Sequence, residues 1–163
     1  MTQAKSVHST PRRTAPKNSP SYEVDNLPDV YCMKLDGDCL EPLIPHGASV
    51  VLKKSERIAA GDIVCVWFHP RIIKPGMPSA WLKRLQLNIP PWVKFPYADH
   101  PDSNVQAALL LEQITPPQSY RMKCSDVIGL HKAIGYAPAC EIGGSVRSDT
   151  IMPIGDDVVP VLT

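Results

Sequence analysis

The chain has 163 residues, of which 44% are apolar and 20% charged, and its formal net charge is +1. This length and apolar content suit one domain with a hydrophobic core, while the balanced charge gives no overall attraction to nucleic acid or to an anionic membrane. Eighteen prolines, about twice the usual share, argue against a helical bundle and favour short strands joined by rigid turns.

The five cysteines contain no CxxC pair and lack zinc-ligand spacing, so neither a metal site nor a cofactor is expected. Reduced thiols are typical of a cytoplasmic protein. The chain has no apolar run near the ~20 residues that a membrane helix needs, and no apolar stretch follows the first basic residues as in a secretory signal. We therefore expect a cytoplasmic protein with no membrane partner.

Residues 1–25 are polar and show no apolar periodicity, which predicts a flexible tail. A small basic cluster in this tail, Arg12, Arg13 and Lys17, could touch a phosphate backbone, although a solvated tail is the simpler interpretation. The tail is too short for a helix-turn-helix domain. Any contact with DNA is therefore expected to be indirect or weak.

From residue 30 onward the pattern predicts strands. Val30–Leu35 and Ser49–Lys53 are the first two candidates. The β-branched and aromatic run Ile63–Phe68 follows, and Trp81–Leu87, which alternates around Lys83, is the next candidate.

The second half of the chain is less regular. Residues 88–105 are rich in proline and aromatic residues and predict an irregular loop or short edge strands. Ala107–Ile114 fits a strand or a short helix, because periodicity alone does not decide, and Val127–Tyr136 predicts the last core strand. The fold class is therefore mainly β with short helical turns, in a domain spanning residues 26–140 and followed by a loosely attached C-terminal extension, residues 141–163.

One predicted turn carries residues suited to nucleophilic chemistry. Gly37–Pro42 reads Gly-Asp-Cys-Leu-Glu-Pro, in which the glycine and aspartate predict a turn leaving a strand. Leu40–Pro42 suits the start of a short helix, with Glu41 near the positive end of the helix dipole. Cys39 would then project near free backbone N–H groups, as a nucleophile beside an oxyanion site does. The residues alone favour the simpler interpretation of a buried apolar cysteine.

A second block, Leu82–Leu85, reads Leu-Lys-Arg-Leu and places Lys83 in an apolar strand. Such a lysine is usually a surface residue whose stem lies along apolar surface, but facing inward it would be desolvated, which favours the neutral amine. The pKa of a free cysteine is about 8.5 and that of a free lysine about 10.4, so proton transfer from sulfur to nitrogen is favourable by roughly 2.6 kcal/mol before burial. Burial penalises the ion pair and can cancel this gain. Both a thiolate–ammonium pair and a neutral pair therefore stay open.

Together the two blocks resemble those of the LexA-like self-cleaving repressor peptidases and their signal-peptidase relatives. In that family the first block normally reads Gly-Asp-Ser-Met-Glu-Pro, its serine is the nucleophile, and a lysine in the second block is the general base. Cys39 stands at the serine position and Lys83, 44 positions later, at the lysine position. The match runs from about Tyr31 to Tyr136, and its other members are Ile44, Pro45, Gly47, Gly61–Val64 and Val127–Gly129.

The resemblance implies a LexA/signal-peptidase-like β-domain in which Cys39 attacks a carbonyl carbon and Lys83 moves the proton. A protein or peptide would be the substrate, and a homodimer is a further expected assembly. Two main functions remain open: a peptidase with sulfur in place of oxygen, and an inactive pseudo-peptidase kept as a binding or dimerisation module in a repressor-type, SOS-response-like regulatory system. A weaker third alternative is a repressor-like regulator whose DNA contact comes from a separate chain.

Self-cleaving members of the family cut at Ala-Gly or Cys-Gly in a segment before the nucleophile. Residues 1–38 contain no such pair, and Ala60-Gly61 lies where a strand is predicted to begin. Self-cleavage at the usual place is therefore not expected.

A papain-like pairing of a cysteine with a histidine is a weaker alternative, because no local motif supports it. The histidines weighed for this role are His46, His69, His100 and His131.

Overall fold

The computed structural model describes residues 22–97, 107–137 and 151–154. Within these ranges a four-residue helical turn, α1 (Tyr22–Asp25), precedes a series of strands. The strands are β1 (Val30–Lys34), β2 (Ser49–Lys53), β3 (Ile63–Phe68), β4 (Ala80–Leu85), β5 (Ala108–Gln113), β6 (Gln118–Lys123) and β7 (Val127–Ala137). Two 3-10 turns, η1 (Pro70–Ile72) and η2 (Cys124–Asp126), precede β4 and β7. The prediction of a mainly β domain with short helical turns is confirmed.

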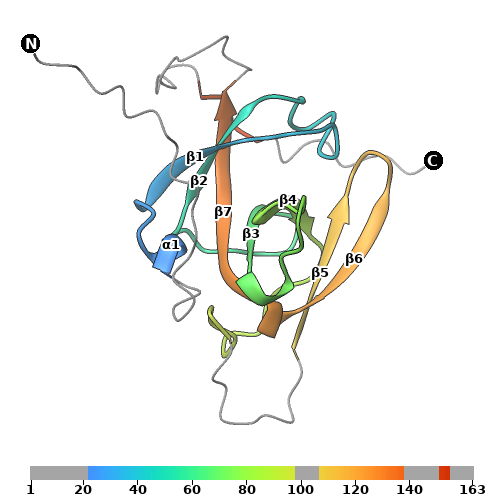
Figure 1. The fold of residues 1–163 in the computed structure, drawn as a ribbon. Coiled ribbons are helices and arrows are strands. Elements are labelled where there is room, and N and C mark those ends of the chain that lie inside the picture. Colours follow the sequence, from blue (N-terminus) through green and yellow to red (C-terminus); the bar gives the residue numbers. More distant parts are fainter. Residues whose placement is uncertain (1–21, 98–106, 138–150, 155–163) are drawn as a thin grey trace, which may run out of the picture.

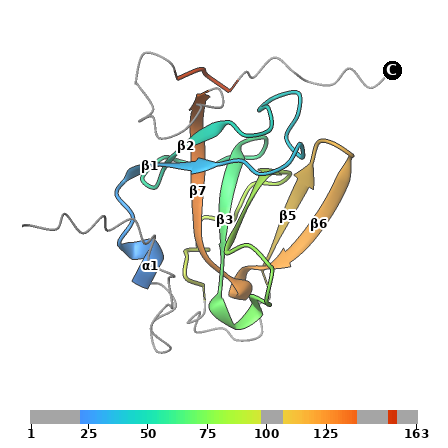
Figure 2. The same ribbon diagram turned by 45° about the horizontal axis from the view of Figure 1, so that its top comes forward.

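The strands form one antiparallel sheet in the order β1-β2-β7-β3-β4-β5-β6. The long strand β7 lies in the interior of this order, where its first half pairs with β3 and its second half with β2. Figures 1 and 2 show β1 and β2 crossing β7 steeply, with the β5–β6 hairpin on the flank opposite α1. This strong twist brings together segments that are far apart in the sequence.

Strand β3 is buried along its whole length, which explains its continuous apolar run. Successive residues of a strand face opposite sides of the sheet. Cys65 and Trp67 accordingly pack in one core cluster, while Val64, Val66 and Phe68 pack in a second cluster on the other face.

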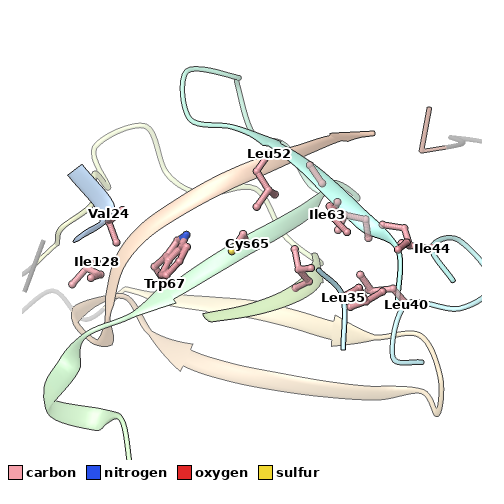
Figure 3. Close-up of a cluster of buried hydrophobic side chains, with 13 residues drawn as sticks. Val24, Leu35, Leu40, Ile44, Leu52, Ile63, Cys65, Trp67 and Ile128 are labelled. Carbon is pink, nitrogen blue, oxygen red and sulfur yellow. The ribbon is translucent and has the colours of Figure 1, made fainter. Parts of the chain in front are cut away.

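The first core cluster also holds residues of the turn that follows β1. Leu40 and Ile44 are fully buried there, together with Leu35 at the end of β1. Figure 3 shows Leu40 beside Leu35, and Ile44 beside Ile63 of β3. Burial of these side chains fixes the position of the turn, because moving it would expose apolar surface to water.

Two details of the predicted elements were wrong. Leu40–Pro42 does not start a helix but lies in a series of turns, with Glu41 N–H donating to Asp38 C=O at 3.0 Å and Ile44 N–H to Leu40 C=O at 3.1 Å. Strand β6 was missed, because its polar residues lack a clear apolar alternation and it is half-exposed at the edge of the sheet. Ala107–Ile114, left open between strand and helix, contains strand β5.

Both ends of the described chain touch the domain. Helical turn α1 lies within the predicted tail, and its Val24 is buried in the first core cluster. In the predicted C-terminal extension, Met152 forms a β-bridge with Tyr136, with N–H to C=O distances of 2.9 and 2.7 Å. Residues 1–21 of the tail, and residues 141–150 and 155–163 of the extension, lie outside the described residues, and the domain limits 26–140 stay predictions. In the part of the chain described, none of the helical segments has the length and apolarity to span a membrane.

A hydrogen-bonded aromatic network lies between β1, β3 and β7. The Trp67 indole N–H donates to the Tyr31 hydroxyl at 2.9 Å, and this hydroxyl lies 2.6 Å from His131 Nδ1. His131 is 6% exposed. Burial lowers the pKa of His131 to about 4, and the nearby Lys54 charge adds to this effect. The ring is therefore neutral near pH 7, when its Nδ1 can accept the Tyr31 hydroxyl.

The lowered pKa of His131 makes folding stability depend on pH. An unfolded histidine takes up its proton near pH 6.5, whereas the folded ring resists protonation until about pH 4. The stabilisation is complete above about pH 6.5 and is lost as the pH falls toward 4, by on the order of 3 kcal/mol in total. Urea unfolding of wild type and His131→Gln between pH 7 and 4 measures it. Wild type should lose more stability than the variant. Equal slopes for wild type and His131→Gln would contradict the expectation.

Candidate active site

Cys39 lies in the loop between β1 and β2, residues 35–48, named here the Cys39 loop. The loop closes through two backbone bonds, Leu35 N–H to Ala48 C=O at 2.8 Å and Gly47 N–H to Leu35 C=O at 2.9 Å. Gly37 and Gly47 have φ of 107° and 79°, a left-handed backbone that glycine adopts without a steric penalty. These glycines let the chain leave β1 and return to β2 within a short loop.

Side chains brace the Cys39 loop from within. Gly37 N–H donates to His46 Nδ1 at 2.8 Å, and His46 N–H donates to Glu41 Oε1 at 3.1 Å. Glu41 and His46 therefore have structural roles in the loop.

The Cys39 loop is also bound to the segment that follows β5. The Cys39 carbonyl accepts the N–H groups of Ile114 at 2.8 Å and Thr115 at 3.2 Å. The Thr115 hydroxyl donates to Glu41 C=O at 2.6 Å. Three hydrogen bonds, two of them to the Cys39 carbonyl itself, thus fix the Cys39 loop to a segment more than seventy positions away.

The thiol of Cys39 occupies a gap between β4 and β5. These strands pair at Arg84 and Leu85 and diverge toward the start of β4. Gln86 N–H donates to a carbonyl of β5, whereas Leu85 N–H donates to Asp62 C=O on the opposite side of β4. Because the backbone groups of successive strand residues point to alternate sides, the Leu82 carbonyl points toward β5 and into the gap. Cys39 Sγ lies 4.0 Å from this oxygen and is half-buried.

Lys83, the next residue of β4, is 7% exposed. It pairs across the sheet with Val64, so its side chain lies on the face of the second core cluster. Its Nζ donates to Gln113 Oε1 at 3.4 Å and lies 5.4 Å from the Trp81 ring centroid and 5.6 Å from that of Tyr120. The lysine is therefore an inward-facing residue, not a surface residue of the strand.

Cys39 and Lys83 line one cavity of about 870 Å³, although 44 positions separate them. Its walls are residues 33–36, 39, 67, 76–83 and 113. The structure gives the two side chains hydrogen bonds to other atoms, Leu82 C=O and Gln113 Oε1. Proximity of the two residues at one cavity is thus found, and a direct contact between sulfur and nitrogen stays a prediction.

Gln113 is a cavity residue that sequence reasoning missed. Its position at the end of an apolar run gives no sign of a role, since the pairing of β4 with β5 is what brings it to Lys83.

A second cavity, of about 970 Å³, lies along β3, β4 and β7 away from Cys39. Its charged walls include two ion pairs, Asp62 with Lys132 at 3.3 Å and Arg84 with Glu112. Paired charges neutralise one another, so this larger hollow is a weaker candidate for chemistry than the one that holds a thiol and an amine.

The other described thiols are poor nucleophiles. Burial raises the pKa of Cys65 to about 12 and that of Cys124 to about 11. Burial also raises the pKa of Cys32, even though this residue on β1 is exposed. Because the thiolate is the reactive form, all three are expected to react slowly at neutral pH.

Three of the four histidines weighed for a papain-like site have other partners: His46 accepts Gly37 N–H, His69 accepts Arg71 N–H, and His131 binds Tyr31. The fourth, His100, lies outside the described residues. Among the described residues no group of three or more His, Cys, Asp or Glu side chains could hold a metal ion.

No family model, curated protein or solved structure matches this chain. The motif resemblance therefore rests on the quoted residues alone.

The attachment of the Cys39 loop can be tested at Thr115. Thr115→Val removes the hydroxyl that donates to Glu41 C=O, and we expect a loss of about 1 kcal/mol in unfolding free energy. Amide hydrogen exchange in residues 37–47 should become faster, because the loop loses one of its three bonds to the segment after β5. Thr115→Ser keeps the hydroxyl and should exchange like wild type. Unchanged loop exchange in Thr115→Val would show that this bond does not hold the loop.

Proposed function

We propose that the protein is a LexA-like thiol peptidase in which Cys39 and Lys83 hydrolyse a peptide bond. The observation that supports this most is that these two residues, predicted as nucleophile and base from separate motifs, line the same cavity. The cavity volume falls within the ~300–1,000 Å³ typical of ligand sites. The resemblance of the motifs implies the roles of the two residues, and their position at one cavity supports the proposal.

The proposed reaction has two steps. Cys39 Sγ gives its proton to Lys83 Nζ and attacks the carbonyl carbon of the scissile bond; the C–N bond then breaks to leave a thioester, and the departing amine takes this proton from Lys83 Nζ. Water then attacks the thioester and gives one proton to Lys83, and when the C–S bond breaks the released sulfur takes that proton from Lys83. The products are a carboxylic acid and an amine, and the enzyme returns to its starting state.

The oxyanion of each tetrahedral intermediate needs N–H donors. The turn bonds of the Cys39 loop use the N–H groups of Glu41 and Ile44. The N–H groups of Cys39 and Leu40 take no part in these turn bonds and are the donors we propose.

The substrate we propose is an extended peptide segment. Strand β1 is an edge strand, and because Leu35 bonds Ala48 of the neighbouring chain segment, alternation points the backbone of Lys34 away from β2. On the opposite wall, Leu82 C=O points into the gap. A peptide lying between these edges could add backbone hydrogen bonds on both sides, as in β-strand addition.

A second candidate is a pseudo-peptidase that binds a peptide without cutting it. One observation favours it. The hydrogen bond of Cys39 Sγ goes to Leu82 C=O and that of Lys83 Nζ goes to Gln113, so neither bond joins the thiol to the amine. In this case the same cavity would serve as a docking site, and the cysteine would be chemically idle.

The reactivity of Cys39 separates the two candidates. A peptidase thiol beside a lysine should be alkylated by iodoacetamide faster than Cys32, although Cys32 is the more exposed. Lys83→Ala should slow the reaction of Cys39 by roughly tenfold, because the thiolate loses about 1.4 kcal/mol of stabilisation. Peptide-resolved mass spectrometry at pH 7.5 measures each cysteine separately.

Lys132→Ala is the matched control for Lys83→Ala, since both lysines lie opposite Val64, one on each side of β3. It should leave the alkylation rate of Cys39 unchanged. A rate for Cys39 no higher than that for Cys65, in wild type and in Lys83→Ala alike, would favour the binding module.

Hydrolysis itself is tested with peptide libraries. Wild type should cleave a subset of peptides that Cys39→Ala and Lys83→Ala leave intact, and Cys39→Ser should retain cleavage if the lysine can activate a hydroxyl. Binding of library peptides by wild type with no cleavage by any variant would support the pseudo-peptidase.

Processing of the chain itself is not expected, because residues 1–38 lack an Ala-Gly or Cys-Gly pair. Purified protein held at pH 9–10, where an amine base is most effective, should keep its full mass. A defined N-terminal cut that disappears in Lys83→Ala would contradict this.

A further inference from the structure

We infer that Gln113 is a positioning residue for Lys83, holding its amine at the cavity that Cys39 lines; this inference rests on the proposed function. Gln113 Oε1 accepts a hydrogen bond from Lys83 Nζ at 3.4 Å, and Gln113 itself lines the cavity. No motif of the sequence assigned it a role.

The carboxamide of Gln113 is itself oriented from two sides. The Tyr120 hydroxyl donates to its Oε1 at 3.3 Å, and its Nε2 donates to Pro116 C=O at 3.2 Å. With Nε2 committed to a carbonyl, the oxygen must face Lys83 and Tyr120. The amide cannot turn over without losing these bonds, so it presents a fixed acceptor to the amine.

Aromatic rings complete the surroundings of the amine. Trp81 on β4 and Tyr120 on β6 place ring faces within 6 Å of Nζ, and their own rings are in contact at 5.4 Å between centroids. A ring face attracts a cation. The rings and the amide oxygen together define one direction for the lysine side chain, which would otherwise have four rotatable bonds to order.

Gln113 also couples the two halves of the site. It directly precedes Ile114 and Thr115, whose N–H groups bind the Cys39 carbonyl. The end of β5 therefore holds Lys83 through a side chain and Cys39 through the backbone. A shift of this segment would move both groups together, which keeps their separation constant.

The test measures the rate and pH profile of Cys39 alkylation by iodoacetamide. Gln113→Leu keeps the volume but removes the acceptor, and should slow alkylation at pH 7.5 by roughly tenfold, close to the effect of Lys83→Ala. Gln113→Glu keeps an acceptor but adds a negative charge that competes with the thiolate for the lysine, so its alkylation profile should move to higher pH. Tyr120→Phe removes one bond to Gln113 and should slow alkylation less than Gln113→Leu does.

Gln86→Leu is the matched control, because the Gln86 amide donates to Glu112 on β5 and Ser119 on β6, the two strands that carry Gln113 and Tyr120. It should leave the alkylation profile unchanged. Lys34 and Asp36 are the other charged side chains at the cavity wall, and they are unaltered in every variant. A purely structural role for Gln113 would lower the melting temperature without moving the pH profile.

The outcomes separate this inference from the proposed function. If Lys83→Ala leaves Cys39 alkylation unchanged, the proposed function and this inference both fall. If Lys83→Ala slows it while Gln113→Glu and Tyr120→Phe keep the wild-type profile, Gln113 does not position the lysine and the proposed function stands. Gln113→Glu and Tyr120→Phe keep the result decisive should Gln113→Leu fail to fold.

Discussion

The hydrogen bonds from Ile114 and Thr115 to the Cys39 carbonyl are the constraint on which the candidate site depends. The Cys39 loop leaves β1 and returns to β2, so its own strands fix its two ends but not its tip. Buried Leu40 and Ile44 hold the tip against the first core cluster. The bonds to the end of β5 then set where the thiol lies relative to β4. Because the loop is held at both ends and at its tip, it has little conformational freedom, and the position of the Cys39 thiol is well defined.

The divergence of β4 and β5 makes this attachment useful. Where the two strands pair, at Arg84 and Leu85, the sheet is closed and its two faces are separate. Toward the start of β4 the two strands separate, so a side chain on the face of the first core cluster can approach a side chain on the face of the second. Cys39 packs against the first cluster, whereas Lys83 points toward the second. The gap therefore explains how two side chains associated with opposite faces line one cavity.

The role required of the lysine differs between a serine and a cysteine nucleophile. A serine hydroxyl must lose its proton to a base during attack, whereas a thiol ionises near neutral pH and needs mainly stabilisation of the thiolate. The surroundings of Lys83, two ring faces and a carboxamide oxygen, all attract a positive charge. Such surroundings suit a lysine that stabilises a neighbouring anion and donates a proton to a leaving amine. A cysteine nucleophile and an enclosed lysine are thus compatible with each other in the proposed dyad.

The sequence by itself determined the β class, the approximate positions of the strands other than β5 and β6, and the two candidate site residues. Those inferences follow from local patterns: alternation, turn residues and short motifs act over a few positions, which is the range that a sequence shows directly. Tertiary structure decided the turns at Leu40–Pro42, the inward direction of Lys83 and the part played by Gln113. The turns depend on burial of Leu40 and Ile44 in the first core cluster. The direction of Lys83 and the part played by Gln113 depend on pairing between strands distant in the sequence, because register and twist determine which side chains meet across a sheet.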